Sequence, residues 1–237
     1  MNRRRSAAVA LLLLAVLAGC SGGGGVDRSA LNESADYDFN RSATVTYDIT
    51  DHSHAAIVNV TAANQTAFEL YLHAELTGKY PLSVSALQFR YPNGTVVGAE
   101  AFTVDRKNSE TVIVPPAENG TMAFTADVSD SHLERPVLAE GSHEVILPRG
   151  MDIAVPVFGD VSPGSYTATT EDDRVHLRWA EAPSGSLSVE YYLERDFWLF
   201  TGLIGVLTVL GLVGVAYFRY QIRVLERQRE QADYGSE

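Results

Sequence analysis

The chain has 237 residues, with 30 acidic and 18 basic side chains and a formal net charge of −12. An acid-rich surface repels a phosphate backbone, so this composition argues against nucleic acid as a partner. Cys20 is the single cysteine, so no disulfide can form within the chain. The length allows one large domain or two small ones.

An apolar run near the N-terminus, residues 7–17, predicts export. It follows Arg3–Arg5 and is too short for a hydrocarbon core, which requires about 20 helical residues. A basic start, a short apolar run and small residues predict a signal peptide over residues 1–19. Leu17-Ala18-Gly19-Cys20 resembles the lipobox of bacterial and archaeal lipoproteins, which implies cleavage before Cys20 and lipidation of its thiol. An ordinary signal peptide with a chance cysteine is the alternative.

A second apolar run, residues 197–218, predicts a membrane span. It contains no charged residue and would be about 33 Å long as a helix. Arginines follow it at once, and the positive-inside rule places that side in the cytoplasm. We therefore expect a single-pass protein of the cell membrane, with an extracellular N-terminal ectodomain and residues 219–237 as a cytoplasmic tail. The arginines of the tail are Arg219, Arg223, Arg227 and Arg229.

The first part of the ectodomain is predicted to form strands. Residues 20–40 are rich in Gly, Ser and Asp, which predicts a flexible tether. Apolar and polar residues then alternate, as in half-buried strands. Pro92-Asn93-Gly94 predicts one hairpin turn, and residues 115–120 predict the loop of a second hairpin. Strands are expected near residues 43–49, 56–60, 68–73, 87–91, 111–114 and 121–126.

A polar stretch, residues 127–140, is expected to connect this block to a second β-rich block. Recurring turn signals predict an all-β ectodomain of one or two antiparallel, Ig-like β-sandwiches, followed by a single C-terminal transmembrane helix. Residues 41–128 would form a β-sandwich domain. Residues 129–196 would form either a second β-rich domain or the second half of the same sandwich. Further strands are expected near residues 143–147, 153–158, 165–170, 175–179 and 187–193.

The lack of catalytic motifs in the sequence predicts that the protein is not an enzyme and has no catalytic, cofactor-binding or metal-ligating residues. It contains no Gly-x-Ser-x-Gly elbow, phosphate loop or His-Glu-x-x-His helix. Asp51-His52-Ser53-His54 is the most suggestive cluster, because two histidines two apart on a strand share a face and could ligate a metal. A polar turn is the simpler interpretation. Glu171-Asp172-Asp173 with His176 offers calcium ligands but fits a hairpin turn better.

Six Asn-x-Ser/Thr sequons lie between the two apolar runs. On an exported chain, each asparagine is a candidate glycosylation acceptor on an exposed turn. These asparagines are Asn32, Asn40, Asn59, Asn64, Asn93 and Asn119.

Segments along most of the chain carry a resemblance to a known family. They include Phe89-Arg-Tyr-Pro-Asn-Gly-Thr95, Val161-Ser-Pro-Gly164, Asp173-Arg-Val-His-Leu-Arg-Trp179 and Tyr191-Tyr-Leu-Glu-Arg-Asp196. The chain resembles uncharacterised haloarchaeal membrane lipoproteins of the domain-of-unknown-function 5803 type. Its acid excess and its two lysines also indicate a salt-loving organism. The resemblance implies no known activity.

These observations predict a membrane-anchored extracellular lipoprotein that serves as a non-enzymatic binding or scaffolding module of the cell envelope. Its expected partners are membrane lipid and another envelope protein. The alternative is a metal-binding or enzymatic ectodomain that uses Asp51, His52 and His54.

Overall fold

The computed structural model describes residues 25–50, 52–74, 78–128, 131–155, 158–181 and 185–234. The chain divides into two compact units, one ending at Tyr191 and one beginning at Tyr192. Each unit is described by itself.

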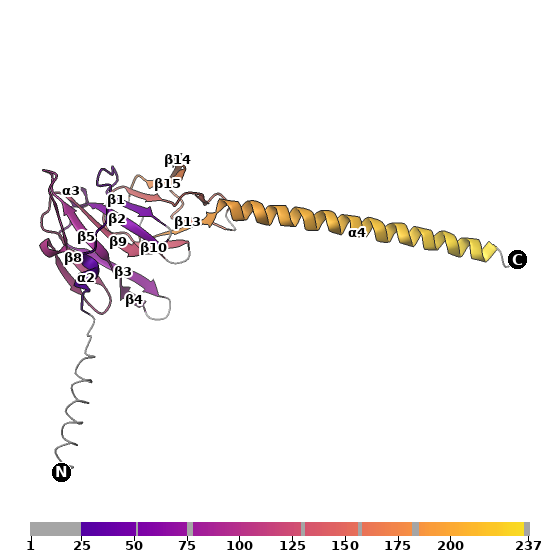
Figure 1. The fold of residues 1–237 in the computed structure, drawn as a ribbon, viewed down its shortest axis with the longest axis horizontal. Coiled ribbons are helices and arrows are strands. Elements are labelled where there is room, and N and C mark those ends of the chain that lie inside the picture. The colour runs from indigo at the N-terminus through magenta and orange to yellow at the C-terminus, as the bar shows by residue number, and fades with distance from the viewer. Residues whose placement is uncertain are drawn as a thin grey trace, which may run out of the picture. The chain divides into compact units, whose positions relative to one another are not determined.

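An eight-stranded sheet forms one layer of the first unit (Figure 1). Strands β1 and β11 run parallel, and the remaining pairings of this sheet are antiparallel. Strands from either side of residue 129 therefore share one sheet. In order, its strands are β14 (Thr167–Glu171), β15 (Arg174–Trp179), β11 (His143–Ile146), β1 (Val45–Ile49), β2 (Ser53–Asn59), β9 (Thr121–Asp127), β5 (Ser85–Arg90) and β6 (Val96–Val97).

Two smaller antiparallel sheets form the other layer. Their inward side chains, such as Phe68, Ile113 and Leu133, join Phe124 and Trp179 of the large sheet in one apolar cluster. The prediction of a mostly β fold before the C-terminal helix is thus confirmed. One small sheet has the order β4 (Gly78–Pro81), β3 (Phe68–Ala74), β8 (Thr111–Val114) and β7 (Thr103–Arg106), and the other has the order β10 (His132–Pro136), β16 (Ser186–Glu190) and β13 (Asp160–Ser162).

Short elements complete this unit: α2 (Arg28–Leu31), α3 (Val60–Ala63), the 3-10 helix η1 (Ala99–Ala101) and β12 (Met151–Asp152). At residues 153–155, part of an expected strand, no strand forms. The Asp152 carboxylate instead accepts hydrogen bonds from the amides of Ile153 and Ala154. This local bonding competes with a strand ladder.

One of the two hairpins predicted in the first block is confirmed. Between β5 and β6, the Gly94 amide donates to the carbonyl of Tyr91, and Gly94 has a φ of +87°, which glycine adopts without strain. The prediction of the second hairpin is wrong, because β8 belongs to a small sheet and β9 belongs to the large sheet. Residues 115–120 connect the two layers. Apolar strand patterns predict that β8 and β9 each bury a face, but they do not show in which layer each strand lies.

The polar connection expected over residues 127–140 is also wrong in part, because it contains β10. Leu133 is fully buried in the core, and β10 pairs with β16. The next inward position of this strand is Arg135, which is 5% exposed. A charged residue at an inward position breaks the apolar alternation, and this hides the strand in the sequence.

The segment expected to be a flexible tether packs on the sandwich from Val26 onward, so that prediction is wrong for residues 26–40. Leu31 of α2 is buried in the core. Tyr37 lies on the opposite face of the large sheet with Ile57 and Ala123. Its hydroxyl donates to the Ala86 carbonyl at 2.9 Å. Tyrosine can satisfy its hydroxyl in this way while burying its ring, so few apolar residues are enough to dock the segment.

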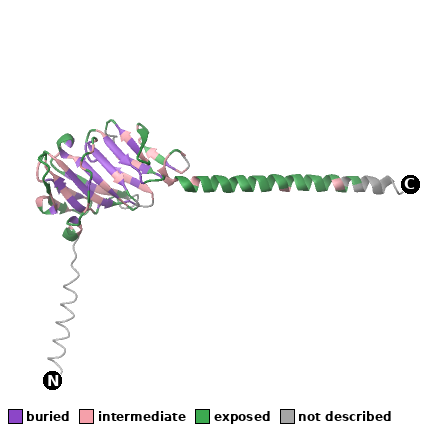
Figure 2. Cartoon of the chain, turned by 45° about the horizontal axis from the view of Figure 1, so that its top comes forward, coloured by how far each residue is buried: buried purple, intermediate pink, exposed green. Residues whose placement is uncertain are grey.

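The second unit consists of β17 (Tyr192–Leu193) and the long helix α4 (Glu194–Tyr234). Residues Glu194–Leu225 are long and apolar enough to cross a membrane, with a mean hydropathy of 2.3 over their most apolar 18 residues. Large apolar side chains such as Leu199 and Leu212 are about two-thirds exposed, and Figure 2 shows α4 exposed along its described length. Within the described residues, one helix could span a membrane, and it lies at the C-terminus as predicted. The helix also continues well beyond the predicted span of 197–218.

Candidate functional site

The residues of the metal hypothesis are not brought together by the structure. His52 is exposed and precedes β2, whereas His54 lies in β2 and is completely buried. Asp51 lies outside the described residues. Within the described part of the chain, no three His, Cys, Asp or Glu side chains are arranged to hold a metal ion. The hypothesis of a site at Asp51, His52 and His54 therefore gains no support.

The structure describes the predicted glycosylation sites but not the predicted lipidation site. Cys20 lies outside the described residues, and its lipidation stays a prediction. Asn59 is half-buried, and its side chain accepts a hydrogen bond from the Ala62 amide, which caps α3. Attachment of a glycan there would compete with this cap. The exposed sequon asparagines are Asn32, Asn40, Asn64, Asn93 and Asn119, and their glycosylation stays a prediction.

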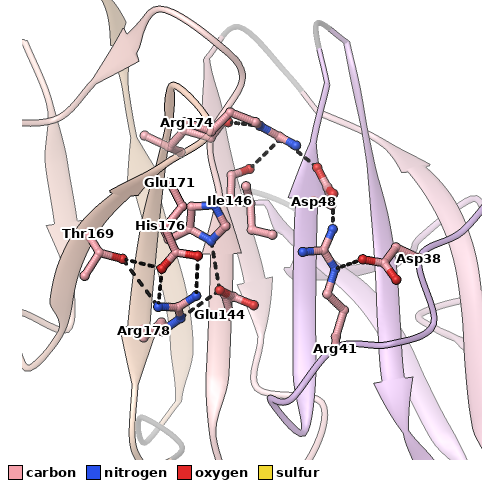
Figure 3. A network of polar contacts seen from close by, with 11 residues as sticks. Asp38, Arg41, Asp48, Glu144, Ile146, Thr169, Glu171, Arg174, His176 and Arg178 are labelled. Carbon is pink, nitrogen blue, oxygen red and sulfur yellow. Dashed lines mark hydrogen bonds and ion pairs between the residues drawn. The ribbon is translucent and has the colours of Figure 1, made fainter.

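A network of ion pairs crosses β14, β15, β11 and β1, and Figure 3 shows its side chains. Arg174 on β15 contacts the Asp48 carboxylate on β1 at 2.6 Å and donates to the carbonyl of Leu147. Arg41 contacts the other oxygen of Asp48 at 2.9 Å. Arg41 also contacts Asp38 at 3.4 Å, so the two guanidinium groups meet two carboxylates.

The second half of the network centres on Glu144, which is 3% exposed. Its carboxylate contacts His176 at 3.0 Å and Arg178 at 2.8 Å. Arg178 also contacts Glu171, and this hydrogen bond lowers the pKa of the Glu171 carboxyl. Asp172 and Asp173 form the β14–β15 turn with φ values of 50° and 63°. The carboxylates of Glu144 and Glu171 are thus occupied in joining strands, and we interpret the network as structural.

A cleft of about 410 Å³ lies where the four-stranded and three-stranded sheets of the second layer meet. This volume falls in the usual range of small-molecule sites, about 300–1,000 Å³. Polar and charged side chains from several strands face it, and Leu72 and Leu82 add apolar surface. The lining residues are Leu72 and His73 of β3, Tyr80 and Pro81 of β4, Leu82, Ser83, Arg106 of β7, Asp127 of β9, and His132, Glu134 and Arg135 of β10.

Arg135 lines this cleft and also a narrow space inside the core. Its Nη1 donates to the backbone carbonyl of Glu134 at 2.7 Å, and its Nη2 donates to the carbonyl of Asp127. The narrow space, bordered by Tyr47 and His54, has no room for a water molecule. Among the described residues, the Arg135 Nε and the Tyr47 hydroxyl are buried without a hydrogen-bond partner. Unpaired polar atoms of this kind are costly and mark the site as unusual.

The electrostatics keep the neighbours of Arg135 neutral. Burial, assisted by the positive charge of Arg135, lowers the pKa of His54 well below its usual value. Burial raises the pKa of the Tyr47 hydroxyl. Burial also lowers the pKa of Arg135, although guanidinium stays charged in proteins. The cluster therefore carries one positive charge, located at the floor of the cleft.

The sequence did not predict the cleft. None of Tyr80, Arg106, His132 or Arg135 belongs to a recognised motif. The one available signal was the position of Arg135, two residues after Leu133 in a possible strand, where an inward side chain is expected.

The fold defines a class: a β-sandwich joined to a helix that can span a membrane. Residues 41–237 match the Family of unknown function (DUF5803), so the chain belongs to this family. The resemblance inferred from the sequence is confirmed at this level. No curated protein and no solved structure matches the chain. The function therefore has to be argued from the geometry of the site.

Buried His54 predicts a specific loss of stability in acid. Its folded-state pKa is lowered, whereas an unfolded histidine binds a proton near pH 6.5. The stabilisation is thus complete above about pH 6.5 and falls below it by up to about 1.4 kcal/mol per pH unit. We expect the free energy of unfolding of the full chain in detergent to decline less steeply in His54→Gln than in the wild type. Chemical denaturation between pH 7.5 and 5 measures both slopes.

The control is His52→Gln, because His52 is exposed. This variant should keep the wild-type slope. His143, whose pKa burial also lowers, contributes a loss of the same sign in every variant. Equal slopes for the wild type and His54→Gln would show that His54 is not held neutral in the fold.

Proposed function

We propose that the protein is a membrane-anchored, non-enzymatic binding or scaffolding module of the cell envelope. Its β-sandwich lies outside the cell, α4 crosses the cell membrane, and the Arg-rich end of α4 faces the cytoplasm. The length and hydropathy of Glu194–Leu225 support the anchor, and the arginines after residue 218 support the orientation. Lipidation of Cys20 would add a second anchor on the extracellular side.

The main support for a binding role is the preformed cleft at Arg135. It combines an aromatic ring, cationic groups and carboxylates on strands of a packed sandwich, which is typical of recognition surfaces. The Ser83 hydroxyl accepts a hydrogen bond from Arg106 at 3.3 Å, and its partner is therefore an arginine and not a histidine. An activated serine nucleophile requires an adjacent general base. The chemistry of the cleft thus favours binding over turnover.

Site-specific photo-cross-linking in intact cells tests this proposal. A photoreactive phenylalanine analogue replaces Tyr80, which is 43% exposed at the cleft, or Val96, which is 48% exposed on β6 and outside the cleft. We expect a discrete cross-linked species from position 80 and none from position 96, because only position 80 faces the binding cleft. Western blotting and mass spectrometry detect the species. A protein that stays uncross-linked at position 80, or gives the same species at both positions, would contradict a binding role for the cleft.

The second anchor has its own test. The intact mass of membrane-extracted wild-type protein should equal a chain that begins at Cys20 plus lipid. The Cys20→Ser variant should lack the lipid mass, because the thiol is the attachment point. A mature wild-type chain without added mass would leave α4 as the sole anchor in the proposal.

A further inference from the structure

Arg135 is a buried cation that meets no carboxylate among the described residues. Its side chain is 5% exposed, its terminal nitrogens donate to two neutral backbone carbonyls, and its Nε has no partner. Asp127 and Glu134 act on this charge without forming an ion pair with it, and a buried charge without a directly bonded counter-ion keeps much of its desolvation cost. An anion that contacts it from the cleft would offset that cost, so the floor of the cleft favours an anionic group.

Arg106 provides a second cation at the rim. It reaches the cleft from β7, and its Nη1 donates a hydrogen bond to the neutral Ser83 hydroxyl. Within the described residues it forms no ion pair, whereas Arg174 and Arg178 of the network contact carboxylates at 2.6 Å and 2.8 Å. In a chain with 30 acidic side chains, two arginines without a carboxylate partner face the same cleft. Arginine is well suited to bind a carboxylate through paired hydrogen bonds.

Asp127 and Glu134 limit the charge of the ligand. Both line the cleft, so the two arginine charges are opposed by two carboxylate charges. A singly charged carboxylate can contact the guanidinium groups, whereas a dianionic phosphate would meet stronger repulsion from the two acids. The same carboxylate oxygens are acceptors for hydroxyl groups.

Tyr80 adds a partly exposed ring to the cleft wall, and Leu72 and Leu82 add apolar surface. A ligand with a ring-shaped apolar face, several hydroxyls and one carboxylate matches all of these features. The volume of about 410 Å³ suits a single ring of this kind with room for its substituents.

We propose that the cleft binds a sugar acid, whose carboxylate faces Arg135 and Arg106 and whose hydroxyls face Asp127 and Glu134. This inference rests on the proposed function as a binding module and names the chemistry of its ligand.

Isothermal titration calorimetry of the full-length protein in lipid nanodiscs tests the inference. The probes are methyl β-D-glucuronide, its neutral counterpart methyl β-D-glucoside, and inorganic phosphate. We expect saturable binding of the glucuronide, and binding of the glucoside weaker by about tenfold or more, because it lacks the charge-assisted hydrogen bonds. Phosphate should bind more weakly than the glucuronide. A parallel titration with free D-glucuronate, which keeps the ring and lacks the glycosidic substituent, distinguishes a soluble sugar acid from the terminal residue of a glycan.

Two matched arginine variants assign the binding to the cleft. Arg106→Gln should weaken glucuronide binding by about tenfold or more, since it removes a charged donor. Arg149→Gln should bind as the wild type does, because Arg149 is exposed and outside the cleft. Arg106→Gln is preferred to Arg135→Gln because the latter also removes two contacts to the backbone.

Equal affinities for glucuronide and glucoside, tighter binding of phosphate, or an unchanged affinity in Arg106→Gln would overturn the inference. Such a result together with a persistent cross-link from position 80 would exclude the sugar acid as the ligand, while the proposal of a binding module would still stand. Loss of both signals would remove the proposed function as well.

Discussion

The position of one arginine at an inward site of a β-sandwich determines how the candidate site is built. Strand β10 must place alternate side chains against the large sheet, and Arg135 occupies one of these positions after Leu133. Its guanidinium reaches the carbonyls of Glu134 and Asp127, which joins β10 to the end of β9. A guanidinium group in this position requires polar partners that an apolar side chain would not need. The cleft lies beside Arg135 in the second layer of the sandwich.

The arginines of the ion-pair network and those of the cleft differ in their hydrogen-bond partners. Across β1, β11 and β15, Arg174 and Arg178 contact Asp48 and Glu144, so charge is balanced within the protein. At the cleft, Arg106 and Arg135 bond to neutral oxygens among the described residues. Exposed ion pairs contribute little to stability, and a buried charge is costly unless it is paired. The difference therefore marks the cleft as the place where an anionic group of a partner can bond directly to the two guanidinium groups.

The local elements could be predicted from the sequence, but their assembly could not. Alternation located β1 and β3, and the Asn93-Gly94 turn identified the β5–β6 hairpin, because these signals depend on neighbouring residues. The parallel pairing of β1 with β11 and the separation of β8 from β9 depend on contacts between distant segments. Strand β10 was missed because Arg135 replaces an apolar residue in its pattern. The residue that hid the strand is the one that forms the floor of the site, and functional positions often violate local rules in this way.

The central claim is that the Arg135 guanidinium awaits an anionic ligand. The most direct test is nitrogen NMR of the full-length protein with labelled arginine side chains, in which Arg135→Lys identifies the Arg135 Nε–H signal. The account predicts that saturating methyl β-D-glucuronide shifts this signal and leaves that of Arg174, which is paired with Asp48, unchanged. An Arg135 signal that does not move, or that moves equally with the neutral glucoside, would contradict the account.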